Sequence, residues 1–171
     1  IGHQRPAEEL NAALRRYLGH GELTLESTDT GYQIARNEEP AHALSEGERT
    51  ALALLYFLRS LVNKDSDLTN GIVVLDDPIS SLDQSAMFAA FGAIREIVKP
   101  AMQIVVLTHN FTFFRLVREW FKNLRGVDRK QQRFLMLKCT AGENGRRSEL
   151  SDLDPLLLNF EPEYHYLFSQ V

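Results

Sequence analysis

The stretch Ile72–Asp83, "IVVLDDPISSLD", carries most of what the sequence predicts about fold and chemistry. Four consecutive apolar residues are typical of a buried strand of a parallel sheet. They are followed at once by Asp76 and Asp77, and a few residues later by two serines and Asp83. One interpretation is that the Asp-Asp-Pro run only ends a strand and starts a turn. The other is that these carboxylates serve a ligand.

The pattern around this stretch predicts an α/β fold. Two more short apolar runs, "QIVVLTH" and "RFLMLKC", follow it, and helical periodicity fills the segments between the three runs. This order predicts right-handed crossovers and a largely parallel sheet with flanking helices. Ligands of such sheets bind beyond the carboxyl ends of the strands. At that edge Asp76 can hold Mg²⁺, and Asp77 can orient or deprotonate an attacking water.

The flanking segments complete the prediction. Helical spacing predicts a helix over 7–18 that ends at a glycine, and alternation predicts two half-buried strands near 23–25 and 32–34. The run over 50–62, "TALALLYFLRSLV", is apolar nearly all round and predicts a buried helix. The polar segment 140–154 predicts a surface loop.

Length and composition narrow the class of protein. The 171 residues are enough for one domain, 1–171, and the net charge of −4 gives no overall case for nucleic acid or anionic membranes. Cys139 is the only cysteine, which excludes an internal disulfide and fits a reducing, cytoplasmic compartment. No apolar run approaches the roughly 20 residues that span a bilayer, so we expect no membrane partner. The chain opens with Ile1, which indicates a piece of something longer.

A second candidate motif, "LSEGERTA", lies directly before the 50–62 helix. Ser45 and the free N–H groups of a helix N-terminus make a favourable phosphate site, and Gly47 would let the backbone approach the anion. The alternative is a capping box, because Ser45 and Glu48 have the S-x-x-E spacing. The two interpretations are compatible, since a cap and an anion use the same N–H donors.

A third candidate is His109, in "VVLTHN" at the end of the second apolar run. A histidine there can donate a hydrogen bond to a phosphate near neutral pH. The alternative is a purely structural histidine.

In this order the motifs resemble ABC-type ATPase heads. "LSEGE" resembles the signature motif, with Glu46 and Glu48 replacing glycine and glutamine, and "IVVLDD" resembles the Walker B strand. "SSLD" resembles the D-loop and "THN" the switch-histidine loop. The form is most similar to the coiled-coil ATPases of the SMC and DNA-repair superfamily, and within it to the ATPase domains of the bacterial anticodon nucleases PrrC and RloC.

The resemblance implies that two heads sandwich ATP, with the signature of one facing the Walker A loop of the other. Ser45 and Gly47 would touch a γ-phosphate held by the second head, and Glu48 would belong to the same cofactor-binding set. Ser81 and Asp83 would couple the two sites across the dimer.

The same resemblance gives roles to the residues at the strand ends. Asp76 would serve Mg²⁺, Asp77 would be the general base, and His109 would sense or steady the γ-phosphate. Most ABC proteins have glutamate at the position of Asp77. Aspartate is one methylene shorter, so its water must be held closer or hydrolysis slows.

The sequence has no Walker A motif, G-x-x-x-x-G-K-[ST]. Without it the phosphate cradle, its lysine and a hydroxyl ligand for Mg²⁺ are missing. We therefore interpret the chain as the C-terminal lobe of a split head, with 7–18 as the root of a coiled coil and a Walker A-bearing N-terminal lobe as partner. We expect the chain alone to bind ATP weakly and not to turn it over.

Basic residues cluster in the segment 113–147, where ten of them face three acids, a local balance of 10 − 3 = +7. The basic residues are Arg115, Arg118, Lys122, Arg125, Arg129, Lys130, Arg133, Lys138, Arg146 and Arg147. Such a cluster can bind the phosphate backbone of DNA or tRNA. The alternative is a solvated helix face and a charged loop.

Two functions follow from these predictions. The first is one half of an ATP-hydrolysing head that gates DNA processing or an associated nuclease. The second is a non-catalytic interaction lobe of a DNA-repair or phage-defence complex.

Overall fold

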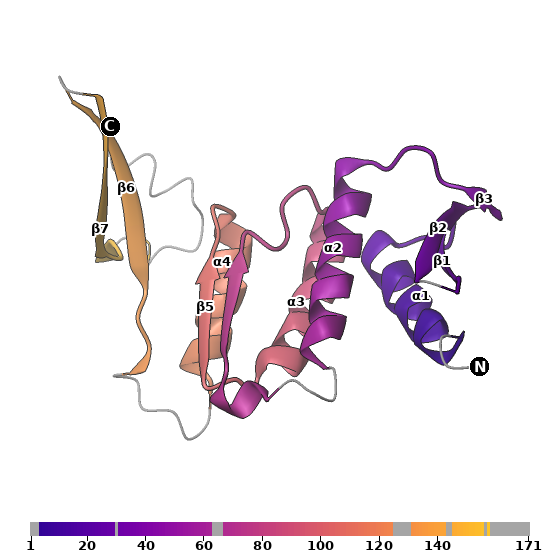
Figure 1. The fold of residues 1–171 in the computed structure, drawn as a ribbon. Helices are drawn as coiled ribbons and strands as arrows, with labels where there is room; N and C mark the ends of the chain where they lie inside the picture. The colour runs from indigo at the N-terminus through magenta and orange to yellow at the C-terminus, as the bar shows by residue number, and fades with distance from the viewer. Residues whose placement is uncertain are drawn as a thin grey trace. The chain divides into compact units, whose positions relative to one another are not determined.

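The computed structural model describes residues 4–29, 31–62, 67–124, 131–142, 145–155 and 157. The chain forms two compact units, 1–113 and 114–171 (Figure 1). The elements are α1 (Gln4–Leu18), β1 (Leu23–Ser27), β2 (Tyr32–Arg36), β3 (Glu39–Pro40), α2 (Glu46–Leu61), η1 (Leu68–Asn70), β4 (Ile72–Asp76), α3 (Gln84–Val98), β5 (Gln103–Leu107), α4 (Phe111–Lys122), β6 (Leu135–Gly142) and β7 (Gly145–Asp152). Within the described residues no helix is long and apolar enough to cross a membrane.

The first unit combines two sheets with three helices. β1, β2 and β3 form an antiparallel sheet, and β4 pairs in parallel with β5. α1 packs against β1, α2 and α3. The largest fully buried side chains of this unit are Leu14, Leu23, Leu58, Ile79, Ile94, Val98 and Phe113. This core fixes the ends of α2 and β4, from which the candidate residues project.

The structure confirms the elements that the sequence predicts near the N-terminus. α1 ends at Leu18, and Gly19 follows with φ +73°, the left-handed conformation that glycine adopts at helix ends. The two strands that alternation predicts pair with each other, with Leu25 opposite Ile34.

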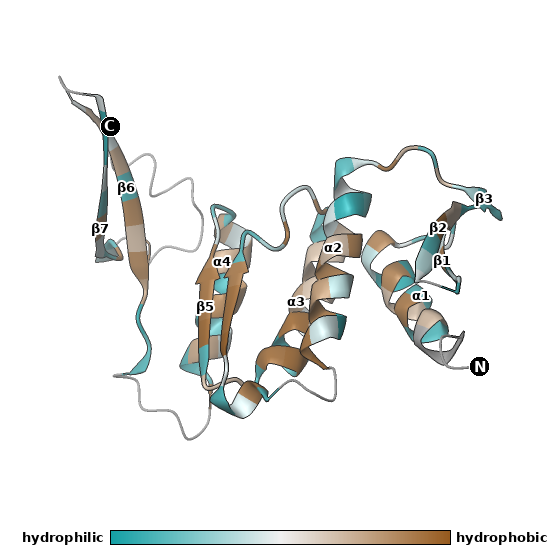
Figure 2. Cartoon of the chain, viewed as in Figure 1, coloured by the Kyte–Doolittle hydropathy of each residue, from teal (hydrophilic) through white to brown (hydrophobic). Residues whose placement is uncertain are grey.

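The strand β4 is less buried than its apolar run predicts. Val73 and Leu75 are 3% exposed, whereas Ile72 and Val74 are 58% and 53% exposed. Figure 2 shows β4 and β5 as hydrophobic over most of their length. Because β4 pairs only with β5 among the described strands, one face and one edge of this apolar strand lack a neighbour.

The helix α2 likewise differs from the buried helix expected over 50–62. Leu54, Leu55 and Leu58 are buried, but Tyr56 is 75% exposed. The helix also begins earlier, at Glu46. The sequence of α2 is therefore apolar on nearly all sides, but the other described parts of the chain do not cover the helix on all sides.

The prediction of a largely parallel sheet is not confirmed. Among the described residues only β4 and β5 pair in parallel, while β6 forms an antiparallel hairpin with β7, from Leu135 opposite Asp152 to Gly142 opposite Gly145. The loop expected over 140–154 is wrong, because most of it is β7. Nearly every β7 residue is exposed, so the strand has no apolar alternation by which the sequence could reveal it.

The second unit begins within α4. The ring of Phe134 packs on Phe114 and Phe121, with centroids 6.3 and 6.4 Å apart. The Arg118 guanidinium donates to the Leu157 carbonyl at 2.9 Å. Arg118 thus serves the packing of this unit, a role that differs from both interpretations of the basic cluster. Arg125, Arg129 and Lys130 lie outside the described residues.

Candidate functional site

The start of α2 is closed by a capping box, as the S-x-x-E spacing predicts. The Ser45 Oγ accepts the Glu48 N–H at 3.2 Å, and the Glu48 Oε2 accepts the Ser45 N–H at 2.7 Å. Ser45 itself is exposed. The helix thus presents a serine at an N-terminus where the backbone dipoles favour an anion.

Glu48 is the one charged residue that is buried among the described residues, at 7% exposure. The Arg36 Nη2 on β2 donates to its two carboxylate oxygens at 2.8 and 2.9 Å. Burial alone would raise the pKa of Glu48, but the Ser45 N–H and the Arg36 guanidinium outweigh it and hold the pKa below its usual value. The Glu48 carboxylate is therefore engaged by groups of its own chain, and it holds the backbone of Ser45 in place.

Gly47 is placed against the loop that follows β4. A Cβ at this position would lie 2.9 Å from the Ser81 carbonyl oxygen, closer than real Cβ contacts allow. Ser81 adopts φ +65°, a left-handed conformation that is uncommon outside glycine. The sequence predicted that Gly47 lets the backbone approach an anion, and the structure adds that it lets the Ser81 carbonyl approach α2.

Asp83 begins the helix that follows this loop. Its Oδ1 accepts the Ala86 N–H at 2.8 Å, so Asp83 is the N-cap of α3. The structure thus gives Asp83 a local role in addition to the coupling role that the resemblance implies.

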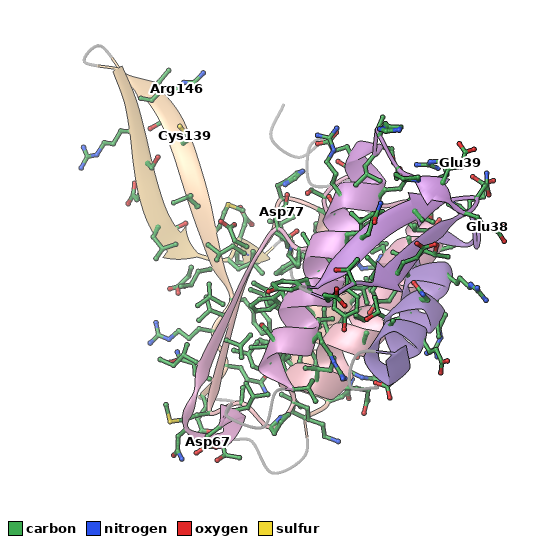
Figure 3. The ribbon with its side chains drawn as sticks, turned by 45° about the vertical axis from the view of Figure 1, so that its right-hand side comes forward. Glu38, Glu39, Asp67, Asp77, Cys139 and Arg146 are labelled. Atoms are coloured by element: carbon green, nitrogen blue, oxygen red, sulfur yellow. The ribbon has the colours of Figure 1, made fainter. Side chains whose placement is uncertain are left out.

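Asp77 lies where β4 ends (Figure 3) and joins the end of β5 in three ways. Its N–H donates to the Leu107 carbonyl at 2.8 Å, which extends the parallel ladder by one bond. Its Oδ1 accepts the Thr108 hydroxyl at 3.1 Å, and its Oδ2 lies 2.7 Å from His109 Nδ1. The Asp77 side chain is 26% exposed and that of His109 is 80% exposed. The sequence-predicted base and histidine are therefore direct partners.

Thr108 is a site residue that the sequence reasoning missed. Its hydroxyl donates to Asp77 and accepts the Asn110 N–H at 3.0 Å. The Asn110 Oδ1 in turn accepts the Phe113 N–H at 3.0 Å at the start of α4. A hydroxyl directly before the histidine, at a strand end, is the signal that could have identified it.

An open hollow of about 360 Å³ lies between α2 and β4. It is lined by Thr50, Ala53, Leu54, Phe57, Val74, Leu75, Asp76, Asp77, Pro78 and Ser80. Within the described part of the chain, no three histidine, cysteine or acidic side chains gather as a metal site. The donor set still fits Mg²⁺, because a nucleotide-bound Mg²⁺ takes one or two protein carboxylates together with phosphate oxygens. Asp76, which is exposed at the strand end, can be such a ligand.

The structure brings the predicted residues into two groups on one edge of the first unit. The N-terminus of α2 and the carboxyl ends of β4 and β5 lie on the same edge, the upper one in Figure 1. One group is Ser45, Gly47 and Glu48 with Ser81 beside them. The other is Asp76 and Asp77 with His109. The contact between Gly47 and Ser81 links the first group to the loop that leaves the second.

Comparison with known proteins identifies a family over the whole chain and relatives over parts of it. Residues 1–171 match the AAA_13 family, an AAA domain. The chain is 30% identical over 111 residues to the DNA double-strand break repair Rad50 ATPase of Sulfurisphaera tokodaii, covering 60% of this chain and 12% of that protein. It is 32% identical over 76 residues to the uncharacterized chromosomal cassette protein CR006 of Staphylococcus aureus, covering 42% of this chain and 11% of that protein.

One solved structure has a similar fold over nearly the full length. It comes from structural work on ATP-driven dimerization and DNA-stimulated activation of SMC ATPases. The TM-score is 0.53 at 14% identity, and the match covers 96% of this chain and 89% of that one. The chain thus has a fold similar to that of an SMC ATPase structure. It spans only 12% and 11% of the two curated relatives.

Proposed function

Because the chain belongs to the AAA domain family and has the mixed α/β fold of SMC ATPase heads, we propose that it is the C-terminal lobe of a head that binds and hydrolyses ATP. Two such heads would dimerise around ATP, and each would contribute its signature surface to the nucleotide of the other. The observation that carries the proposal is the group at the carboxyl ends of β4 and β5. There Asp77 lies 2.7 Å from His109, and Asp76 adjoins it beside an open hollow.

At these strand ends Asp76 would hold Mg²⁺, which neutralises charge on the β- and γ-phosphates. Asp77 would accept the proton of the attacking water. A carboxylate has about four lone-pair positions, so one bond from Thr108 and one from His109 leave room for that water. The exposed imidazole of His109 would reach the γ-phosphate while its Nδ1 faces Asp77.

At the start of α2 the exposed Ser45 hydroxyl and the first N–H groups would contact the γ-phosphate bound to the second head. Gly47 and Ser81 would keep this surface in register with the loop after β4. Support for the arrangement comes from the capping box, which leaves Ser45 exposed and yet fixes its backbone.

The apolar surface beside β4 supports a Walker A-bearing lobe as the partner that completes the head. Ile72 and Val74 are more than half exposed, and the hollow next to them is also lined by Phe57 of α2. A further strand added along β4 would pair its free backbone groups and cover these side chains. Such a lobe would also supply the Walker A loop that the sequence lacks.

The proposal also covers the cellular role of the complete head. We propose that the complete head gates DNA processing or an associated nuclease, with DNA or tRNA as the nucleic acid. The motif resemblance to PrrC and RloC favours the nuclease, and the similarity to a Rad50 ATPase favours DNA repair. Arg146 and Arg147, which are exposed on β7, are candidate contacts to phosphate.

The test is reconstitution. Calorimetric titration of Mg-ATP into the chain alone should show weak binding without turnover, and phosphate release should appear when a Walker A-bearing lobe of the same head is added. Tight binding with turnover by the chain alone would overturn the interpretation as half a head. ATP-dependent pairing without phosphate release would instead favour the non-catalytic interaction lobe.

A further inference from the structure

An ion pair between the partly exposed Arg36 and the buried Glu48 joins the strand β2 to the start of α2. Arg36, the last residue of β2, places its Nη2 at 2.8 and 2.9 Å from the two carboxylate oxygens of Glu48. The same carboxylate accepts the backbone N–H of Ser45 at 2.7 Å. One buried group therefore connects a guanidinium on the antiparallel sheet to the backbone of the exposed serine.

The strand that carries Arg36 is itself held in place. β2 pairs with β1, and β1 is bonded to α1 through Asn11. The Asn11 side chain donates to the Leu25 carbonyl at 3.0 Å and accepts the Leu25 N–H at 2.7 Å. An amide that satisfies both backbone groups of one residue acts as a neighbouring strand would. Arg36 thus reaches Glu48 from a fixed position.

We propose that Arg36 is a positioning residue for Ser45, acting through Glu48, and that it fixes the serine hydroxyl and the first turn of α2 for the γ-phosphate. This inference rests on the proposed function of that surface. Arg36 does not contact the nucleotide. Removing the Arg36 guanidinium leaves the buried Glu48 carboxylate without its cation. Such a carboxylate moves towards water, and its hydrogen bond to the Ser45 N–H is then lost.

An ion pair that only stabilises the fold would not act on Ser45 in particular. Arg59, in the last turn of α2, provides the matched comparison. Its Nη1 lies 3.3 Å from Glu9 Oε2, and the two side chains are 46% and 64% exposed. Arg59→Gln also removes one positive charge, but from the end of α2 opposite to Ser45.

The experiment measures amide hydrogen exchange at Ser45 by nuclear magnetic resonance in the unaltered chain and in the two glutamine variants. Hydrogen bonds to charged groups correspond to roughly tenfold to hundredfold in an equilibrium constant, so we expect Arg36→Gln to accelerate Ser45 exchange at least about tenfold over Arg59→Gln. Arg36→Lys, which keeps the positive charge, should recover part of the protection. If Arg36→Gln does not fold, Ser45 exchange in Arg36→Lys and in Glu48→Gln is compared with that in Arg59→Gln instead.

A double-substitution cycle tests whether Arg36 acts through Glu48. Adding Arg36→Gln to Glu48→Gln should not accelerate Ser45 exchange further, because the carboxylate through which Arg36 acts is already lost. Additive effects, or equal Ser45 exchange in Arg36→Gln and Arg59→Gln, would overturn the inference.

ATP-dependent pairing of the complete head is the functional readout. Arg36→Gln should weaken pairing, whereas Arg59→Gln should leave it unchanged. Equal pairing in both variants, with pairing lost in Ser45→Ala, would overturn the inference. If Ser45→Ala leaves pairing unchanged, the proposed nucleotide role fails, and the exchange data still decide whether Arg36 positions Ser45.

Discussion

The start of α2 and the ends of β4 and β5 share one edge of the first unit but are built in opposite ways. At α2 the key carboxylate, Glu48, is 7% exposed and is satisfied by Ser45 and Arg36. At the strand ends Asp77 and His109 pair with each other, and the histidine side chain is 80% exposed. The first region is fixed by its own chain, and the second presents its polar groups to solvent.

Backbone conformation follows the same division. Ser45 has the extended conformation that N-caps normally adopt, with φ −63°. Asp77 has φ +44°, and such conformations of non-glycine residues cost about 1–3 kcal/mol and cluster at functional sites. The N-cap of α2 is therefore built without backbone strain, whereas Asp77 at the end of β4 and Ser81 in the loop after it both have positive φ.

The largest expected effect tests the catalytic half of this comparison. Asp77→Asn keeps the shape of the side chain and removes the base, so phosphate release by the reconstituted head should fall by about 10²- to 10⁴-fold. Nucleotide-dependent pairing should persist, because it depends on the surface at α2. Asp67→Asn, at the exposed start of η1, is the matched control. Undiminished phosphate release by Asp77→Asn would show that Asp77 is not the general base.

The next effect tests the fixed half. Gly47→Ala places a Cβ 2.9 Å from the Ser81 carbonyl, and overpacking of this kind costs about 1–3 kcal/mol of unfolding free energy. Gly92→Ala is the control, because a Cβ there meets nothing within 4 Å. Since Gly92 lies inside α3, that variant should gain about 0.5–1 kcal/mol. Urea denaturation of both variants measures the difference, and equal stabilities would contradict the close contact.

A smaller effect concerns the cap that follows the Ser81 loop. Asp83→Ala removes the oxygen that accepts the Ala86 N–H at 2.8 Å and should cost about 1 kcal/mol. Asp83→Asn keeps a capping oxygen and should lose only a small part of that. If both variants retain ATP-dependent pairing, Asp83 acts only as a cap; loss of pairing in Asp83→Asn would instead support the coupling role.

The smallest effect is a dependence of stability on pH. The pKa of Glu48 lies below its usual 4.5 in the folded chain, so the unfolded chain binds the proton more tightly. This contribution is complete above about pH 4.5 and is lost as the pH falls through the lowered pKa. Urea midpoints between pH 6 and pH 3 should fall less in Glu48→Gln than in the unaltered chain. Parallel curves would show that Glu48 does not carry the effect.

Local sequence rules predicted the parts of the site that depend on neighbours in sequence. The capping box of Ser45 and Glu48 and the carboxylates at the end of β4 follow from spacing alone. The placement of Asp77 and His109 at one edge also follows, because parallel strands end together, but the direct contact between their side chains was not predicted.

The parts that the sequence did not reveal depend on contacts between distant residues or on missing neighbours. Arg36 meets Glu48 from another sheet, and no spacing rule connects them. The strand β7 is polar because nearly all of its residues are exposed. α2 and β4 are more apolar than their burial requires, and the proposed partner lobe rests on this excess of exposed apolar surface.

The side of β4 that pairs with no described strand has a consequence for aggregation. Its sequence from Ile72 to Leu75 contains no lysine or proline of the kind that discourages strand edges from joining one another. Two copies that expose this edge would therefore pair strand to strand and aggregate. A neighbouring strand on this edge would protect the chain from such aggregation.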